Sequence, residues 1–400
     1  MDSISSDKKR GFRTTLSHIG RITKKEHGFV NPPLLRGSTV LAPTVAERKA
    51  MAAKRGARVL TYGTGGSSTH WALEDAIAAI EGGTRCYLVS TGLAAVTTPL
   101  LGFLKSGDHL LMPDHVYGPA RNFASGMLRD LGIETTFYVP EVDEAGMRAL
   151  MRPNTKVVYT ESPGSHTFEV QDVPAIARAA HAGGAKVFMD NTWGIHHFQP
   201  FTHGVDVSIQ AATKYPAGHS DVLIGAITVN NEADWLVLHA AGRMLGQYAS
   251  PDDCWLTLRG VRTMAVRLQA QMESAMQVAH WLRGQPEVAQ VLHPALPGAP
   301  GHELWRRDFT GACSLFGVEF KPSFTAEDTH RFVESLELFG IGASWGGYES
   351  LAVPTTGFIT RTAGGKGFPG PVVRLHIGLE DPDDLMADLR QGLDVMGRKG

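Results

Sequence analysis

The chain has 400 residues, of which 43% are hydrophobic and 20% are charged, and its formal net charge at pH 7 is -2. This composition is typical of soluble globular proteins and excludes disordered, fibrous and membrane-embedded classes. Because the charge is balanced and no polybasic run is present, the sequence argues against nucleic acid or an anionic membrane as a partner and favours a small-molecule substrate.

Cysteine usage and the N-terminal segment indicate the compartment. Cys86, Cys254 and Cys313 are widely spaced and odd in number, which is typical of reduced thiols rather than a disulfide framework. The first 25 residues lack the apolar stretch of a secretory signal, and no apolar run is long enough to span a bilayer. We therefore expect a cytoplasmic protein without membrane contact.

Three parts follow one another along the chain. Residues 1–60 are predicted to form an N-terminal arm with a short helix at 44–55, and residues 61–251 a first domain that opens with a helix at 69–80. Seven β-rich runs then alternate with helical stretches, at 86–90, 109–112, 134–138, 157–160, 187–189, 207–210 and 224–229. Such alternation predicts an α/β fold with a mostly parallel seven-stranded sheet, whose ligand-binding loops lie at the carboxyl ends of the strands.

The last part, residues 252–400, is predicted to be a smaller α+β domain. A long helix at 252–283 would connect it to the first domain, because its apolar residues recur at helical spacing. Strands are predicted at 288–293, 315–320 and 372–377, and helices at 326–338 and 382–396.

A lysine and an aspartate follow neighbouring strands of the first domain. Asp190 ends the run at 187–189, and Lys214 follows the run at 207–210, so both belong at the same edge of the sheet. Pyridoxal phosphate (PLP) needs a lysine amine to bind its aldehyde and a carboxylate beside its ring nitrogen. Taken alone, the two residues are equally compatible with a turn-capping Asp and a surface Lys.

Further residues fit the same cofactor. Ser90 to Ala95 form a strand-to-helix junction whose amides suit a phosphate. Tyr117 lies in a loop where its ring is placed either against a cofactor or in the core. Arg374 is a charged residue within an apolar strand, which favours an anionic partner such as a substrate carboxylate.

Several longer motifs carry a family resemblance. They are Val30-Asn31-Pro32-Pro33, Glu161-Ser162-Pro163-Gly164, Asp190-Asn191-Thr192-Trp193, Gln210-Ala211-Ala212-Thr213-Lys214-Tyr215, Gly218-His219-Ser220-Asp221, Ser344-Trp345-Gly346-Gly347-Tyr348-Glu349-Ser350 and Arg374-Leu375-His376-Ile377-Gly378-Leu379-Glu380. With them the chain resembles the Cys/Met-metabolism PLP-dependent enzymes over nearly its whole length, and within that family the bacterial cystathionine β-lyases. The resemblance implies fold type I, the fold of aspartate aminotransferase, and cleavage of cystathionine to homocysteine, pyruvate and ammonia.

The resemblance also implies roles for individual residues. The catalytic pair would be Lys214, which would hold the cofactor and move the substrate proton, and Tyr117, which would stack on the ring. The implied cofactor contacts are Asp190, Gly92, Leu93, Thr213 and, from a neighbouring subunit, Tyr62; the implied substrate contacts are Arg374, Ser344, Trp345 and Thr64. A homotetramer built from dimers that share active sites is implied as well.

One loop departs from the family pattern. Where the related lyases have arginine after the tyrosine that matches Tyr62, this chain has Thr64 and Gly65, and Ala343 stands where they have a bulky tyrosine. A cationic substrate end, such as the guanidinium of canavanine, would benefit from the lost charge, so a γ-lyase that releases hydroxyguanidine is an alternative. Otherwise, other residues restore the missing contacts and the reaction is ordinary cleavage of cystathionine.

Other classes of protein share some of these features. A PLP-binding regulatory protein would share the fold, but the presence of the full catalytic set argues against it. An aminotransferase would share fold and cofactor. His196, His197 and His203 lack the partners of a metal site, so we expect no metal, and the glycine-rich segment 61–68 lacks the context of a dinucleotide or P-loop motif.

Overall fold

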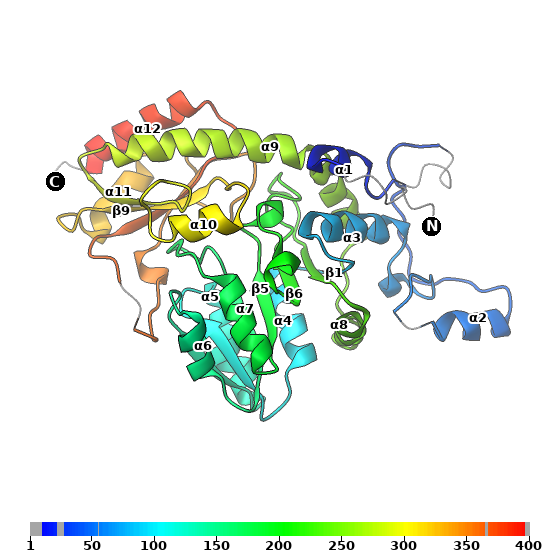
Figure 1. Cartoon of the computed structure of the whole chain (residues 1–400). Helices are drawn as coiled ribbons and strands as arrows, with labels where there is room; N and C mark the ends of the chain where they lie inside the picture. Colours follow the sequence, from blue (N-terminus) through cyan, green and yellow to red (C-terminus); the bar gives the residue numbers. More distant parts are fainter. Residues whose placement is uncertain (1–9, 22–27, 55, 365–366, 397–400) are drawn as a thin grey trace.

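The computed structural model describes residues 10–21, 28–54, 56–364 and 367–396, and it arranges them around two β-sheets (Figure 1). The first sheet has the strand order β1-β7-β6-β5-β4-β2-β3, with β7 antiparallel to β1 and β6 and the other neighbours parallel. Its strands are β1 (Arg85–Val89), β2 (His109–Pro113), β3 (Glu134–Tyr138), β4 (Thr155–Glu161), β5 (Lys186–Asp190), β6 (Val207–Gln210) and β7 (Gly225–Val229). The predicted mostly parallel seven-stranded sheet is therefore confirmed.

Helices cover both faces of this sheet because its strands are apolar on both sides. Along β5, Val187 and Met189 belong to one buried cluster and Phe188 belongs to another. The first face carries α3 (Ser68–Glu81), α6 (Glu144–Leu150) and α7 (Val173–Ala182), and the second carries α4 (Gly92–Phe103), α5 (Gly118–Phe123) and α8 (Glu232–Met244). This layering leaves the carboxyl ends of the parallel strands free to form a site.

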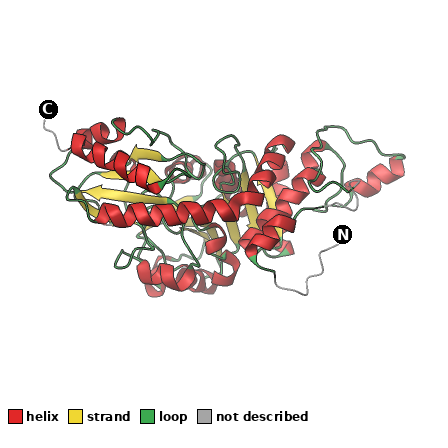
Figure 2. Cartoon of the chain, turned by 90° about the horizontal axis from the view of Figure 1, so that it is seen from above, coloured by secondary structure: helices red, strands yellow, loops and turns green. Residues whose placement is uncertain are grey.

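Helix α9 (Pro251–Arg283) runs along one side of the whole molecule, from the first sheet to the second (Figures 1 and 2). The second sheet has the order β10-β11-β9-β8 and is antiparallel. The strands of this sheet are β8 (Val288–Leu292), β9 (Leu315–Phe320), β10 (Leu351–Pro354) and β11 (Val372–His376). The helices of the same part of the chain are α10 (His302–Asp308), α11 (Ala326–Glu334) and α12 (Pro382–Met396). The predicted smaller α+β part is confirmed, with β10 and α10 as elements that the sequence did not predict.

One predicted helix ends early. The sequence predicts a helix over 326–338, but α11 stops at Glu334. The Asp388 carboxylate accepts the backbone N–H groups of Glu337 and Leu338 at 2.9 and 2.8 Å, and this bonding draws the chain out of the helix.

The N-terminal arm contacts the body of the molecule at several places, and one of its helices extends away from it. Helix α1 (Phe12–His18), which the sequence did not predict, buries Leu16 against α9 and α3. Helix α2 (Val45–Ala52) buries no residue and projects outward in Figure 1. Its predicted end at residue 55 lies outside the described residues.

Short helical turns complete the fold at η1 (Gly63–Gly65), η2 (Ala124–Leu128), η3 (Ile195–His197), η4 (Pro200–His203) and η5 (Thr356–Phe358). Among the described residues, no helix is both long and apolar enough to cross a bilayer.

Candidate active site

A cavity of about 300 Å³ lies where the carboxyl ends of the first sheet's strands face the C-terminal part of the chain. Most of the site residues predicted from the sequence line it: Gly92, Leu93, Tyr117, Asp190, Thr213, Lys214, Trp345 and Arg374. They come from four strand ends and from two segments of the C-terminal part. Residues that lie up to 282 positions apart in sequence, from Gly92 to Arg374, thus line one cavity.

The side-chain amine of Lys214 lies at this cavity and has an unusually low pKa. Its Nζ donates to Ser344 Oγ at 2.7 Å and lies 5.3 Å from the centroid of the Trp345 ring. Burial, followed by the charge of Arg374, lowers the pKa of Lys214 to about 8, although the charge of Asp190 acts in the opposite direction. The neutral, nucleophilic form of this amine is therefore far more populated near neutral pH than that of an ordinary lysine.

This acidity predicts the pH dependence of labelling in the cofactor-free protein. Lys214 should react with an amine-directed acylating reagent half-maximally near pH 8, whereas an ordinary lysine requires a pH of about 10.4. Arg374→Ala removes a positive charge and should shift the Lys214 profile to higher pH. The measurement is the labelling rate of each peptide by mass spectrometry, with exposed Lys321 as the internal control. Superimposable profiles for Lys214 and Lys321 would contradict the prediction.

Asp190 and Glu161 are neighbouring carboxyl groups on the cavity wall. The N–H of Thr192 donates to Asp190 Oδ1 at 3.0 Å, and burial raises the pKa of Asp190 while Thr192 and Lys214 lower it. Burial and then the charge of Asp190 raise the pKa of Glu161 well above its ordinary value. The pair therefore favours a neutral Glu161 and leaves the negative charge on Asp190, where it can meet a protonated ring nitrogen.

The start of helix α4 forms an anion-binding corner of the cavity. Thr91 accepts the Ala94 N–H at 3.1 Å, while the amides of Gly92 and Leu93 precede the first intrahelical bond and face outward. A side chain at Gly92 would approach Ala211 Cβ to 2.7 Å, so glycine is required there. Thr213 also lines this region, but its hydroxyl donates to Ile224 O and accepts from Ile224 N.

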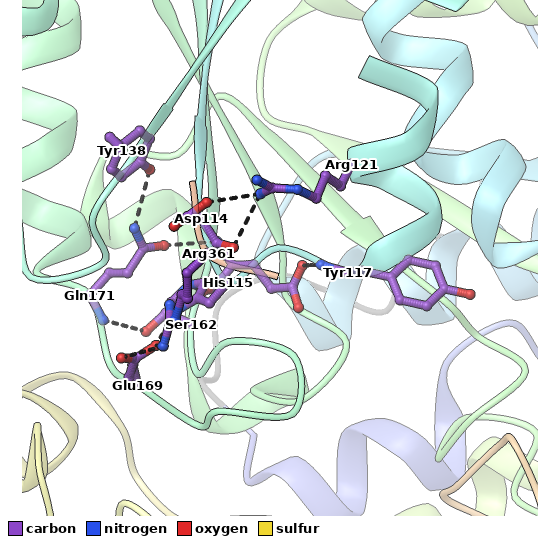
Figure 3. Close-up of polar contacts among 10 residues, drawn as sticks. Asp114, His115, Tyr117, Arg121, Tyr138, Ser162, Glu169, Gln171 and Arg361 are labelled. Carbon is purple, nitrogen blue, oxygen red and sulfur yellow. Dashed lines mark hydrogen bonds and ion pairs between the residues drawn. The ribbon is translucent and has the colours of Figure 1, made fainter. Parts of the chain in front are cut away.

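Tyr117 is held by its backbone, which leaves its ring free. The Tyr117 N–H donates to Glu161 Oε2 at 2.8 Å, and Figure 3 shows the ring pointing away from the polar cluster behind it. The ring lines the cavity and is 42% exposed. Burial, followed by the charge of Asp190, raises the pKa of the Tyr117 hydroxyl.

The loop that carries Tyr117 is fixed by a buried ion pair with α5 and by hydrogen bonds to the C-terminal part, and an ion pair between Arg361 and Glu169 lies beside it (Figure 3). Asp114 accepts the backbone N–H groups of Thr362 and Ala363 at 2.8 and 2.9 Å and pairs with Arg121 at 3.0 Å. Arg361 pairs with Glu169 at 2.7 Å. These contacts were not predicted from the sequence, and they position Tyr117 by joining the two halves of the chain.

Removing Asp114 should therefore destabilise the protein. Asp114→Ala leaves the guanidinium of Arg121 buried without its carboxylate, and breaking such a pair costs about 3 kcal/mol. Urea denaturation measures this loss. The matched control is Asp130→Ala, which removes an exposed pair with Arg129 and should change the stability by less than about 1 kcal/mol. Equal losses of stability in the two variants would show that the buried Asp114–Arg121 pair contributes no more than the exposed pair.

Arg374 offers a buried positive charge to the cavity. Its Nη2 donates to the carbonyls of Gly342, Ala343 and Ser344 at 3.4, 3.1 and 3.1 Å, and none of the ion pairs in the described ranges includes it. Burial lowers its pKa to about 10, which leaves it charged at neutral pH. Neutral acceptors orient the guanidinium without cancelling its charge, so a carboxylate is its natural ligand.

Ser344, Tyr62 and Thr64 lie differently from the other predicted residues. Ser344 contributes its hydroxyl to Lys214 and its carbonyl to Arg374. Tyr62 and Thr64 do not line the cavity within one chain; Thr64 lines a separate hollow beside α8. There Arg243, a residue that the sequence did not single out, donates to Thr64 Oγ1 at 3.2 Å.

The cavity fits the cofactor predicted from the sequence. Lys214 would hold the PLP aldehyde, Asp190 would face its ring nitrogen, and Tyr117 would cover its ring. The amides at the start of α4 would hold its phosphate in the corner that Gly92 keeps open. No group of His, Cys, Asp or Glu within the described ranges is arranged to hold a metal ion.

Comparisons with known proteins agree with this geometry. The sequence model of the family described as Cys/Met metabolism PLP-dependent enzyme matches residues 13–394. The cystathionine beta-lyase of Bordetella avium is 43% identical over 98% of this chain and 99% of its own length. The cystathionine beta-lyase MetC of Escherichia coli is 42% identical over 97% and 98%. The crystal structure of metB from Corynebacterium glutamicum has a TM-score of 0.87 at 30% identity and covers 96% of this chain and 98% of its own.

Proposed function

We propose, from the premise that the chain belongs to the Cys/Met metabolism PLP-dependent enzyme family, that it is a cystathionine β-lyase. It would cleave a carbon–sulfur bond of cystathionine and release homocysteine, pyruvate and ammonia. The observation that carries the proposal is the meeting of Lys214, Asp190 and Arg374 in one cavity. The names of the two lyases that match nearly the whole chain support the choice of substrate.

Within this proposal, each residue has a distinct task. Bound PLP supplies an aldehyde that captures the substrate amine and a ring that withdraws electrons from it. Arg374 binds the α-carboxylate and so orients the Cα–H bond toward Lys214, whose amine removes that proton. Asp190 would supply the negative charge that keeps the ring nitrogen protonated. Tyr117 would cover the ring and exclude water.

The same residues would serve β- and γ-elimination, so the substrate decides between the two. A γ-lyase for canavanine rests on the absence of arginine at Thr64 and Gly65, and the relatives named above give it no support. A regulatory protein without catalysis would not need a lysine with a lowered pKa and a buried arginine bound only by neutral carbonyls in one cavity. A β-lyase needs the lysine to remove a proton and the arginine to bind the substrate carboxylate.

A homotetramer built from dimers is part of the proposal. Phe29, Leu41 and Val45 of the arm are 73%, 88% and 71% exposed, and such apolar side chains suit burial against a second copy. Tyr62, half exposed and outside the cavity of its own chain, would then reach the cofactor phosphate of its neighbour. We also propose that the protein works in the cytoplasm.

We retain the domain boundaries predicted from the sequence as part of the proposal. Residues 1–60 would form the arm, 61–251 the PLP-binding domain and 252–400 the C-terminal domain. Helix α9, which begins at Pro251, is consistent with the second boundary.

A competition assay tests the function. PLP-loaded protein receives equal amounts of cystathionine and canavanine, and the products are identified by mass spectrometry. Homocysteine and pyruvate in equal amounts, with canavanine unconsumed, are expected. Hydroxyguanidine with unconsumed cystathionine would contradict the proposal, and so would 2-oxobutyrate with cysteine, the products of γ-elimination from cystathionine.

A further inference from the structure

The loop from Tyr62 to Gly66 is hydrogen-bonded to the N-terminal arm and contacts an arginine from elsewhere in the chain. Its backbone is fixed by the Gly63 N–H, which donates to Ser38 O at 2.6 Å. Nη1 of Arg243, at the end of α8, donates to Thr64 Oγ1 at 3.2 Å and lies 3.6 Å from the position that a Cβ at Gly65 would occupy. The guanidinium therefore lies beside Thr64 and Gly65, the two loop positions that have no arginine.

Two arginines line the hollow beside this loop, and they differ in whether a carboxylate pairs with them. Arg58 pairs with Glu74 at 3.1 Å and with Asp75 at 2.7 Å. Arg243 takes part in none of the ion pairs found in the described part of the chain, and its bond to Thr64 has a neutral acceptor. The positive charge beside the loop is therefore uncompensated.

The position of Arg243 near the C-terminus of α8 offers a simpler explanation. Cations are favoured at that end of a helix by its dipole, whatever else they contact. The dipole alone, however, does not explain the hydrogen bond to Thr64, in a loop 179 positions away in sequence. This contact holds the charge beside the loop, where it can bind an anion from outside the chain.

We propose that Arg243 supplies the positive charge that the Tyr62–Gly66 loop lacks, and that it binds an anionic oxygen group in the active site of a neighbouring subunit. This inference rests on the proposed function and on the sharing of sites between subunits. The anion is the cofactor phosphate or the distal carboxylate of the substrate. In either case Arg243 repels a guanidinium, so the loop selects against a substrate such as canavanine.

The test combines cofactor binding with substrate discrimination in the full-length oligomer. Arg243→Ala is compared with Arg243→Lys, which keeps the charge, and with Arg243→Ala combined with Thr64→Arg, which returns an arginine from the loop itself. Arg259→Ala, at an exposed position on α9, is the control. Three quantities are measured: the dissociation constant of PLP from the reconstituted protein, and KM for cystathionine and for S-methylcysteine, which has no distal carboxylate.

Loss of a charge-assisted contact should change one of these quantities by roughly tenfold or more. If Arg243 binds the phosphate, its alanine variant weakens PLP binding. If it binds the distal carboxylate, KM rises for cystathionine and stays constant for S-methylcysteine. In both cases Thr64→Arg restores the loss and Arg259→Ala shows none.

Unchanged PLP binding and unchanged KM values in Arg243→Ala would overturn the inference. An equal change in Arg259→Ala would overturn it as well, because the effect would then be nonspecific. If the unmodified protein leaves cystathionine intact, the proposed function fails, and the PLP titration still decides whether Arg243 binds the phosphate.

Discussion

Lys214→Ala should abolish covalent attachment of PLP and reduce lyase turnover by at least ~10³-fold, because one amine holds the cofactor and moves the substrate proton. The expected loss exceeds that of any other single substitution in the cavity. Absorbance of the cofactor-loaded protein reports the attachment, and pyruvate release reports turnover.

The control for this variant is Lys321→Ala, which removes an exposed lysine far along the chain. It should keep both the absorbance of bound PLP and the turnover. A Lys214→Ala protein that retained the visible band would show that another lysine holds the cofactor. The assignment of Lys214 would then be wrong, even if the fold were unchanged.

Arg374→Ala should lower kcat/KM for cystathionine by roughly 10²-fold or more, because the α-carboxylate loses a buried, charge-assisted partner. Steady-state kinetics measure the loss. PLP absorbance should persist, since Arg374 contacts neither the ring nor the phosphate in this account.

Arg374→Lys separates charge from geometry. A lysine keeps the positive charge but cannot form two parallel bonds to a carboxylate, so its kcat/KM should fall between those of the unmodified protein and Arg374→Ala. If Arg374→Ala bound cystathionine with an unchanged KM and turned it over normally, the α-carboxylate would have to lie elsewhere.

The first sheet could be predicted from the sequence because its strands are short apolar runs separated by helical stretches. The strand at 186–190, for example, is apolar on both faces, as a covered parallel strand must be. Strand β10, four residues long and ending in proline, carries too little pattern to distinguish it from a loop. Helix α1 depends on packing against α9, which local propensity does not reveal.

The candidate site was predicted in part because its residues belong to recognisable motifs. Lys214, Asp190 and Tyr117, which follow or end strands of the first sheet, line one cavity together with Arg374, a charged residue within strand β11. Their individual roles stay predictions until variants are measured.

Other contacts could not be predicted, since they join residues distant in sequence. The bond between Thr64 and Arg243 spans 179 positions, and the bond between Asp114 and Thr362 spans 248. The Thr64 loop itself has no positive charge, but the fold places the Arg243 guanidinium beside it. All seven strands of the first sheet lie between this loop and the end of α8 in the sequence, and no spacing rule connects two residues so far apart.

The most direct test of the central claim is to reduce the PLP-loaded protein with borohydride, digest it, and map the modified residue by mass spectrometry. Reduction fixes the cofactor on the amine that holds it. The account predicts a pyridoxyl group on Lys214, in the peptide that contains Thr213 and Tyr215. Modification of a different lysine, or of none, would contradict the claim that this cavity is the active site.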